Sequence, residues 1–496
     1  MRIRALQFAF LLLILAALSA QADPLARPGD MLLRHDIKLL VDAGIIDLPV
    51  GTWPIPWNDI FTQLNRAPAV RPSPEVDGAM VSLRDRARRE LDKGRFSWTA
   101  RASIAANPRM IRTFEDTPRE DAEAGLALSW TGNRFTANIA AAYAYNPLDG
   151  EEFRPDDTYL GVALGNWMVT AGWQQRWWGP GNDASSILSS NARPRPGMTL
   201  QRTLSTPFET KWLSWIGPWN LTTFMEYLDD ERQTKDPLLW GFRVGFRPLS
   251  GLEINVSRTA MWCGEGRPCD FSTFVDVLKG NDNKGQNTTP EEEPGNQLAG
   301  YDIRWSLPKD IPVALYMQWT AEDGRPQGVP LGSLLRLVGA EHWGSIRGFA
   351  HRTHIEVAET ICREGGFGGS NKKPDCAYTH PLYPTGYRYN QRVMGHSIDA
   401  DGRSYSLGST LVESDGHTWS VTLRYMQINT VSFNGNPDPN HSLSPTPQDR
   451  VDIQLSHVRS TPLGRFHIGA GYSYLDDAET GVDDSEITGF ISWSMR

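Results

Sequence analysis

The sequence predicts a transmembrane antiparallel β-barrel of about 18 strands, preceded by a small N-terminal helical bundle. Three observations lead to this fold class. The chain begins with an export signal, and near residue 95 its hydrophobic pattern changes from a period of about 3.6 to a period of 2. The connections between the predicted strands also alternate between short and long, as they do in outer-membrane barrels.

Residues 1–22 have the three parts of a secretory signal peptide. Arg2 and Arg4 supply the positive start, Phe8 to Leu18 form the apolar core, and Ala20-Gln21-Ala22 provides a small-residue cleavage site. The apolar core is shorter than the roughly 20 residues that a membrane-spanning helix needs, which argues against a membrane anchor. The remaining chain is therefore expected in an oxidising compartment outside the cytoplasm.

Residues 23–94 are predicted to form a compact helical bundle in the periplasm. Asp30 is a suitable N-cap for the first helix, and Ser73 followed by Pro74 marks the start of the last one. The last helix places its apolar residues on one face, at Val76, Met80, Leu83, Ala87 and Leu91. Such amphipathic helices bury their apolar faces against one another.

Residues 95–496 are predicted to form an outer-membrane β-barrel with long extracellular loops. Alternation begins at Phe96 and continues to the C-terminus, with a tight hairpin turn at Thr131-Gly132-Asn133. The candidate strands have roughly 9–12 residues, which is the length a tilted strand needs to cross a membrane. Short connections at one end and long loops at the other indicate that the long loops lie outside the cell. The connection near 207–217 is longer than this alternation predicts.

The same alternation directs many charged side chains into the barrel lumen. They are Arg101, Glu226, Arg243, Arg247, Glu253, Asp302, Arg304, Arg352, Glu356, Arg424, Asp452 and Arg465. An ion-selective pore favours one sign of charge along its constriction. Since both signs occur here in comparable number, we expect ion pairs between them and a substantially filled barrel.

Composition narrows the list of partners. The net charge is −9, and it becomes more negative once the two arginines of the signal peptide are removed, so nucleic acid is not expected as a partner. The 18 Trp, 14 Tyr and 18 Phe suit a protein with aromatic rings at the membrane–water interface. Outer-membrane lipid is therefore an expected partner.

The four cysteines fall into two close pairs, each flanked by Gly and Pro. Cys263 lies near Cys269, and Cys362 lies near Cys376. In an exported chain this arrangement favours two local disulfides that fix loops. Zinc is the alternative, but the spacings match none of the common zinc patterns. No metal site and no cofactor is predicted.

An irregular stretch from Arg176 to Arg202 is the main candidate for a functional segment. Its prolines and glycines interrupt regular structure, and we expect the part near 177–200 to fold inward as a plug. Alternation directs Trp177 outward and Trp178 inward. The candidate carbohydrate-binding residues are Arg176, Trp178, Asp183, Asn191, Arg193, Arg195 and Arg202. An indole can cover the apolar face of a sugar, and guanidinium groups can pair with acidic sugar carboxylates.

This segment also carries a family resemblance. Arg176-Trp177-Trp178-Gly179-Pro180-Gly181, Ile187 to Pro194 and Leu200-Gln201-Arg202 resemble the signature of the Wzi family of outer-membrane capsule-assembly proteins. Further matches are Leu39 to Gly44, Trp53 to Trp57, Pro294 to Asp302 and Gly395 to Asp401. The resemblance implies a barrel of about eighteen strands with a periplasmic helical bundle. It also implies binding of capsular polysaccharide at the cell surface, without catalysis. The leading interpretation is therefore a protein that binds and organises capsular or extracellular polysaccharide, with polysaccharide export machinery as a further expected partner of the helical bundle.

Two other functions remain open from the residues alone. A barrel of this size has room for a substrate-specific saccharide channel. A glycoside hydrolase or lyase would use paired carboxylates such as Glu226 and Glu253, but almost any polar lumen offers such pairs. The sequence contains no Gly-x-Ser-x-Gly elbow, P-loop or His-Glu-x-x-His motif, so a non-enzymatic binding protein is the leading interpretation.

Overall fold

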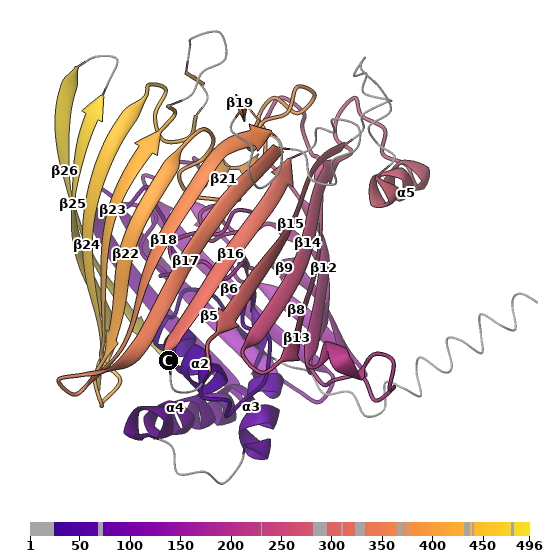
Figure 1. Ribbon diagram of the computed structural model, residues 1–496, viewed down its shortest axis with the longest axis vertical. Coiled ribbons are helices and arrows are strands. Elements are labelled where there is room, and N and C mark those ends of the chain that lie inside the picture. The colour runs from indigo at the N-terminus through magenta and orange to yellow at the C-terminus, as the bar shows by residue number, and fades with distance from the viewer. Residues whose placement is uncertain are drawn as a thin grey trace, which may run out of the picture.

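The computed structural model describes residues 24–67, 73–229, 231–280, 295–308, 311–322, 333–364, 371–373, 376–430, 437–438, 441–477 and 481–496. Figure 1 shows a tall barrel of tilted strands with the N-terminal helices packed under one end. The C-terminus lies at this same end, where the connections between strands are short. We call it the short-turn end, and the opposite end the long-loop end.

The helical bundle consists of α2 (Met31–Asp42), α3 (Trp57–Arg66) and α4 (Pro74–Glu90). The Asp30 side chain caps α2 by accepting a hydrogen bond from the Leu33 amide, and Ser73 caps α4 as its sequence predicts. The apolar faces of the three helices meet in one buried core with the short strands β2 (Thr52–Trp53) and β3 (Ile55–Pro56). β3 also pairs with β1 (Leu25–Ala26).

Eighteen long antiparallel strands close the barrel in the described part of the chain, which confirms the predicted fold class. They are β4 (Phe96–Ala106), β5 (Ala122–Thr131), β6 (Phe135–Tyr145), β8 (Tyr159–Leu164), β9 (Trp167–Trp173), β11 (Pro196–Arg202), β12 (Trp219–Tyr227), β13 (Leu238–Leu249), β14 (Leu252–Trp262), β15 (Gly295–Ser306), β16 (Val313–Glu322), β17 (Ser333–Ile346), β18 (Phe349–Glu364), β22 (Arg403–Val412), β23 (Thr418–Ile428), β24 (Gln448–Thr461), β25 (Gly464–Asp477) and β26 (Val482–Met495). The last strand pairs with the first, which closes the barrel.

The remaining elements are short and belong to connections. They are β7 (Phe153–Arg154), β10 (Trp177–Trp178), β19 (Asn371–Lys373), β20 (Arg388–Tyr389), β21 (Arg392–Val393), the 3-10 helix η2 (Ser214–Ile216) and the helix α5 (Phe271–Lys279). β20 and β21 pair with each other in the long connection before β22.

Alternation along the strands separates an outer apolar surface from a polar lumen. Outward-facing Leu126 is 66% exposed and Ile487 is 73% exposed, whereas the lumen residues Arg243 and Asp302 are fully buried. A protein that exposes large aliphatic side chains all around its wall must surround that wall with an apolar solvent, as a bilayer does. Of the helices in the described ranges, none has the length and apolar character needed to cross a membrane.

Charged side chains of the lumen form ion pairs with one another and with the bundle, as the balance of charges predicts. Near the bundle, the Asp42 carboxylate at the end of α2 contacts the guanidinium groups of Arg304 and Arg352, each at 2.8 Å. Glu341 on β17 binds the same two arginines and also the Lys38 ammonium at 2.8 Å. This network joins the helical bundle to the barrel wall at the short-turn end.

One expectation about the irregular segment is wrong. Trp177 does not face outward: its side chain is fully buried, and β10 pairs with β2 of the bundle so that Trp177 lies opposite Trp53. The physical reason is that β9 ends at Trp173, and the chain leaves the wall before alternation can direct Trp177. The chain rejoins the wall at Pro196, where β11 begins, so residues 174–195 are the inward-folded part. We call them the plug segment.

A buried acid in the bundle provides a pH-dependent prediction. Burial raises the pKa of Asp36 on α2 to about 7. In the unfolded chain the same carboxyl ionises near pH 4. Between about pH 4 and pH 7 it therefore ionises more readily in the unfolded chain than in the folded one, and the free energy of unfolding falls as pH rises. Asp36→Asn should therefore raise the free energy of unfolding by at most about 4 kcal/mol at pH 8 and by much less at pH 4. Thermal unfolding of both proteins in detergent at the two pH values measures this; an equal difference at both would contradict it.

Candidate functional site

Most of the predicted binding residues hold the plug segment in place. Arg176 and Arg195 both pair with the Glu226 carboxylate of β12, at 2.7 Å and 2.8 Å. Asp183 pairs with Arg424 of β23 at 2.6 Å. Trp178 is fully buried, and its ring lies 5.3 Å from that of Phe224. These side chains are paired with residues of the barrel wall, which agrees with the predicted inward-folded plug.

Arg202 lies at the other end of the wall from the long loops. It is the last residue of β11, and its guanidinium carbon lies 3.8 Å above the Trp219 ring. It donates hydrogen bonds to the backbone carbonyls of Trp219 and Thr206. Arg202 therefore belongs to the short-turn end of the barrel, far from the loops that a surface glycan would meet.

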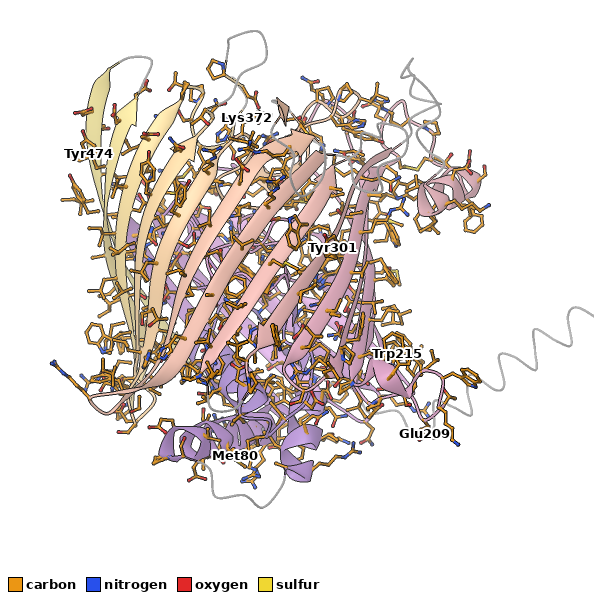
Figure 2. The ribbon with its side chains drawn as sticks, in the orientation of Figure 1. Met80, Glu209, Trp215, Tyr301, Lys372 and Tyr474 are labelled. Atoms are coloured by element: carbon orange, nitrogen blue, oxygen red, sulfur yellow. A yellow bond between two sulfur atoms is a disulfide. The ribbon has the colours of Figure 1, made fainter. Side chains whose placement is uncertain are left out.

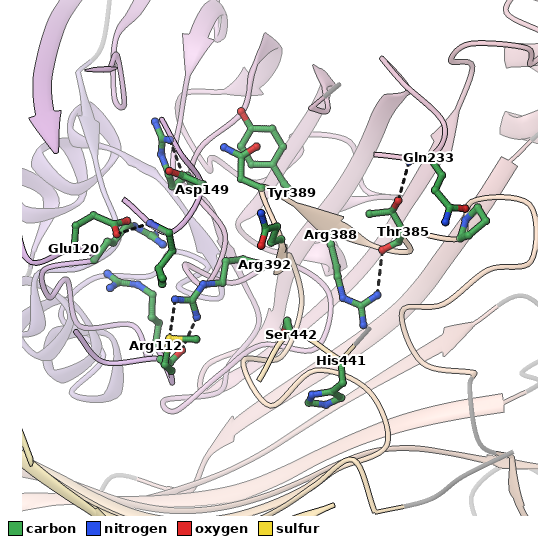
Figure 3. A pocket seen from close by; sticks show the side chains of 17 residues that line it. Arg112, Glu120, Asp149, Gln233, Thr385, Arg388, Tyr389, Arg392, His441 and Ser442 are labelled. Atoms are coloured by element: carbon green, nitrogen blue, oxygen red, sulfur yellow. Dashed lines mark hydrogen bonds and ion pairs between the residues drawn. The ribbon is translucent and has the colours of Figure 1, made fainter. Parts of the chain in front are cut away.

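A cavity of 410 Å³ opens among the connections of the long-loop end (Figure 3). Its lining comes from the connections before β5, β7, β13, β22 and β24 and from the plug segment. Five arginines face it: Arg112, Arg119, Arg193, Arg388 and Arg392. We call this group the arginine cup. Of the seven predicted binding residues, all of which the structure describes, Arg193 alone lines it.

The carboxylates of the arginine cup are already paired. Asp149 contacts Arg193 at 2.8 Å and Arg154 at 3.1 Å, and Glu120 contacts Arg154 at 2.7 Å. Arg388 is held by Asp399, whose carboxylate lies 2.8 Å away. Although burial opposes ionisation, Arg388 lowers the pKa of Asp399 to about 2. These pairs fix the shape of the cavity.

Arg119 and Arg392 are different, because within the described ranges neither forms an ion pair with a carboxylate. Arg119 donates at 2.7 Å to the backbone carbonyls of both Ser190 and Asn191. Arg392 donates to the carbonyl of Met110 at 3.0 Å. Burial, and then the neighbouring Arg119, lowers the pKa of Arg392 to about 10. The two guanidinium groups are still charged near pH 7, and they repel each other.

Arg112 adds a third positive charge to this side of the cavity. Its guanidinium donates to the carbonyl of Thr117 at 2.8 Å, and its ion pair with the exposed Asp116 is long, at 3.6 Å. Arg112, Arg119 and Arg392 thus form a positive region that an anion would stabilise. Tyr389, Asn390 and Gln391 contribute a ring and two amides beside it.

Residues of the plug segment form hydrogen bonds that hold the arginine cup in place. The carbonyls that orient Arg119 belong to this segment, and the Asn191 side-chain amide donates to the Val393 carbonyl at 2.9 Å. The Ser189 hydroxyl donates to the Gly395 carbonyl at 2.5 Å. Asn191 therefore positions the β20–β21 hairpin, although it does not line the cavity.

Both cysteine pairs form disulfides, Cys263 with Cys269 and Cys362 with Cys376. The second joins the end of β18 to the start of the long connection that carries Arg388 and Arg392. The first supports the same connection, because the Tyr383 hydroxyl donates to the Cys263 carbonyl at 3.1 Å. The disulfides thus fix the wall of the cup that comes from this connection.

Removing the second disulfide tests this role. It closes a loop with a sequence separation of 14 residues, and a loop of this length is worth about 3 kcal/mol. A variant with Cys362→Ser and Cys376→Ser should expose residues 376–393 to proteases while the barrel strands stay protected. Limited proteolysis with mass spectrometry measures the cleavage sites. Unchanged protection of this connection would show that the disulfide does not hold the cup.

Comparisons with known proteins agree with the predicted family. Residues 93–474 match the family described as capsule assembly protein Wzi. A protein of Klebsiella pneumoniae, described as an uncharacterized 55.8 kDa protein in the cps region, is 29% identical over 424 residues, which cover 84% of this chain and 80% of that protein.

A solved structure from Escherichia coli shows the same fold. It is described as Wzi, an outer membrane protein involved in group 1 capsule assembly and a carbohydrate-binding β-barrel. It superposes with a TM-score of 0.80 at 24% identity, over 95% of this chain and 99% of that chain. The fold and the family match confirm the resemblance carried by the segment from Arg176 to Arg202 and place the barrel in the outer membrane. Because the family match covers most of the sequence, this chain belongs to the Wzi family of capsule assembly proteins.

Proposed function

We propose that this protein binds and organises an acidic capsular or extracellular polysaccharide at the cell surface, without catalysing a reaction. The long-loop end then faces the outside of the cell and presents the arginine cup to the polymer. The helical bundle faces the periplasm, where the polysaccharide export machinery is its expected partner. Family membership supports capsule assembly as the process and favours this function over a saccharide channel.

The observation that carries the proposal is the positive region of the arginine cup. Arg119 and Arg392 present charged guanidinium groups to the cavity without a carboxylate partner in the described ranges. A guanidinium binds a carboxylate through two parallel hydrogen bonds, and uronate and pyruvyl groups are the carboxylates of acidic polysaccharides.

Neighbouring groups complete a saccharide site. The Tyr389 ring can cover the apolar face of a pyranose, and Asn390, Gln391 and Gln233 offer amides to its hydroxyl groups. The Escherichia coli protein of the same fold is described as carbohydrate-binding, which supports a saccharide as the ligand here.

Binding and surface retention test this function together. Purified protein should co-sediment with the acidic polysaccharide of the producing organism, less so as salt is raised, and should generate no new reducing ends. A deletion strain should release polysaccharide into the medium. Retention of all polysaccharide by that strain, together with no binding by the purified protein, would refute the proposal.

A further inference from the structure

Two segments lie outside the barrel wall on the same side, one at each end of the strands. The helix α5 lies beside the long-loop end of β13 and β14, and the connection between β11 and β12, which contains η2, lies beside the short-turn end of β13. Both project to the right of the wall in Figure 1. The second is the connection whose length exceeds what the loop alternation predicts.

α5 packs against the outward face of the wall. Its Phe274 ring lies 5.0 Å from that of Trp262 and 6.1 Å from that of Trp240, two residues that alternate with lumen residues along β14 and β13. Outward-facing Arg258 donates to the carbonyls of Val277 and Leu278 at the C-terminal end of the helix. Phe271, on the side of α5 that does not contact the wall, is 80% exposed.

The connection at the short-turn end packs against the same wall. The Trp215 ring lies 6.4 Å from that of Phe246, and the Phe208 ring stacks on Trp219 at 4.6 Å. Phe246 and Trp219 both belong to the outward-facing set of their strands. Trp212 is nevertheless 88% exposed and Trp215 is 62% exposed, so this segment leaves two indole rings largely uncovered by the protein. Figure 2 shows Trp215 beside the wall.

The exposed side chains of both segments continue the apolar surface that faces the bilayer. Tyr227 and Val256, on the strands between them, point outward and are 58% and 49% exposed. Indole rings favour the membrane–water interface, and an amphipathic helix with apolar residues on one face lies in the plane of that interface. Lipid is therefore the occupant that the position of these segments favours over a soluble protein.

We propose that α5 and the segment 208–216 are two lipid anchors on one side of the barrel, α5 in the outer leaflet and the segment around Trp212 in the inner leaflet. A wall held at both interfaces resists vertical displacement and tilt more strongly than the opposite wall. The anchors would keep the arginine cup at a fixed height above the membrane. They do not depend on polysaccharide binding.

Site-specific fluorescence tests both anchors. An environment-sensitive dye would be attached to Trp212→Cys and, separately, to Phe271→Cys, since the native cysteines are held in disulfides. The proteins would be reconstituted in phospholipid vesicles that contain lipids with a quencher at the top of the acyl chain. Asp415→Cys in the short turn before β23 and Glu151→Cys in a long-loop connection serve as exposed polar controls.

Both anchor positions should show a blue-shifted emission and quenching severalfold stronger than the controls. Control-level quenching at either anchor would overturn the proposal, including the case in which a second copy or a protein partner covers these residues. If a variant fails the heat-modifiability test for a folded barrel, Trp215→Cys and Leu278→Cys report on the same two segments.

Discussion

Replacing both Arg119 and Arg392 with glutamine is expected to weaken binding of an acidic oligosaccharide by at least about 100-fold. Hydrogen bonds to charged groups contribute about 1.5–3 kcal/mol each, and 1.4 kcal/mol corresponds to a factor of ten. Glutamine keeps a donor for the carbonyls that hold these side chains but removes the positive charge. Calorimetry with a single repeat unit measures the change without the avidity of a polymer.

Arg202→Gln is the matched control for this prediction. Arg202 also donates to backbone carbonyls and has no carboxylate partner in the described ranges, but it lies at the short-turn end of β11. Its replacement should leave oligosaccharide affinity within about twofold of the wild type. Equal losses in the double variant and in the Arg202 variant would mean that general destabilisation, not the cup, controls binding.

Replacing Asp42 with asparagine is expected to lower the free energy of unfolding by about 3 kcal/mol. The Asp42 carboxylate is fully buried, contacts both Arg304 and Arg352 at 2.8 Å and accepts a hydrogen bond from Ser306. Its removal leaves two buried guanidinium groups to share Glu341. The melting temperature of the detergent-solubilised protein should fall, and the bundle should become accessible to proteases before the barrel does.

Asp47→Asn separates the effect of burial from that of pairing. Asp47 also joins the region before α3 to a lumen arginine, since it contacts Arg247 at 2.6 Å, but its side chain is 52% exposed. Water compensates much of that pair, so the expected loss is about 1 kcal/mol or less. If both variants unfold at the same temperature as the wild type, the buried network does not hold the bundle in the barrel.

The local pattern of the sequence was sufficient to predict the barrel and the bundle. Alternation is a local property, and Phe96, Leu126 and Ile487 face outward where the period of 2 directs them. The same rule failed at Trp177, because a strand period applies only while the chain remains in the sheet. The partner that redirects Trp177 is Trp53, which belongs to the bundle and lies far away in sequence.

The arginine cup was harder to predict, because connections that are distant in sequence build it. Arg193 is among the predicted residues, but Arg112 and Arg119 lie in the connection before β5, and Arg388 and Arg392 lie in the connection before β22. The approach of these two stretches depends on barrel closure. One signal was present: residues 388–392 combine arginine, an aromatic ring and amide side chains, as the segment that includes Arg193 does with tryptophan in place of tyrosine. Composition does not reveal which arginines form ion pairs with carboxylates. Arg176 pairs with Glu226, whereas Arg119 donates to backbone carbonyls.

The central claim is that the cup recognises the carboxylates of a polysaccharide, and a change in the ligand tests it most directly. The native acidic polysaccharide and the same polymer with its carboxyl groups chemically reduced to alcohols would be titrated against wild-type protein at low salt. Chain length and glycosidic linkages stay the same, and each carboxylate becomes a neutral primary alcohol. We expect binding to the native polymer and almost none to the reduced one. Equal binding of both polymers would contradict the claim.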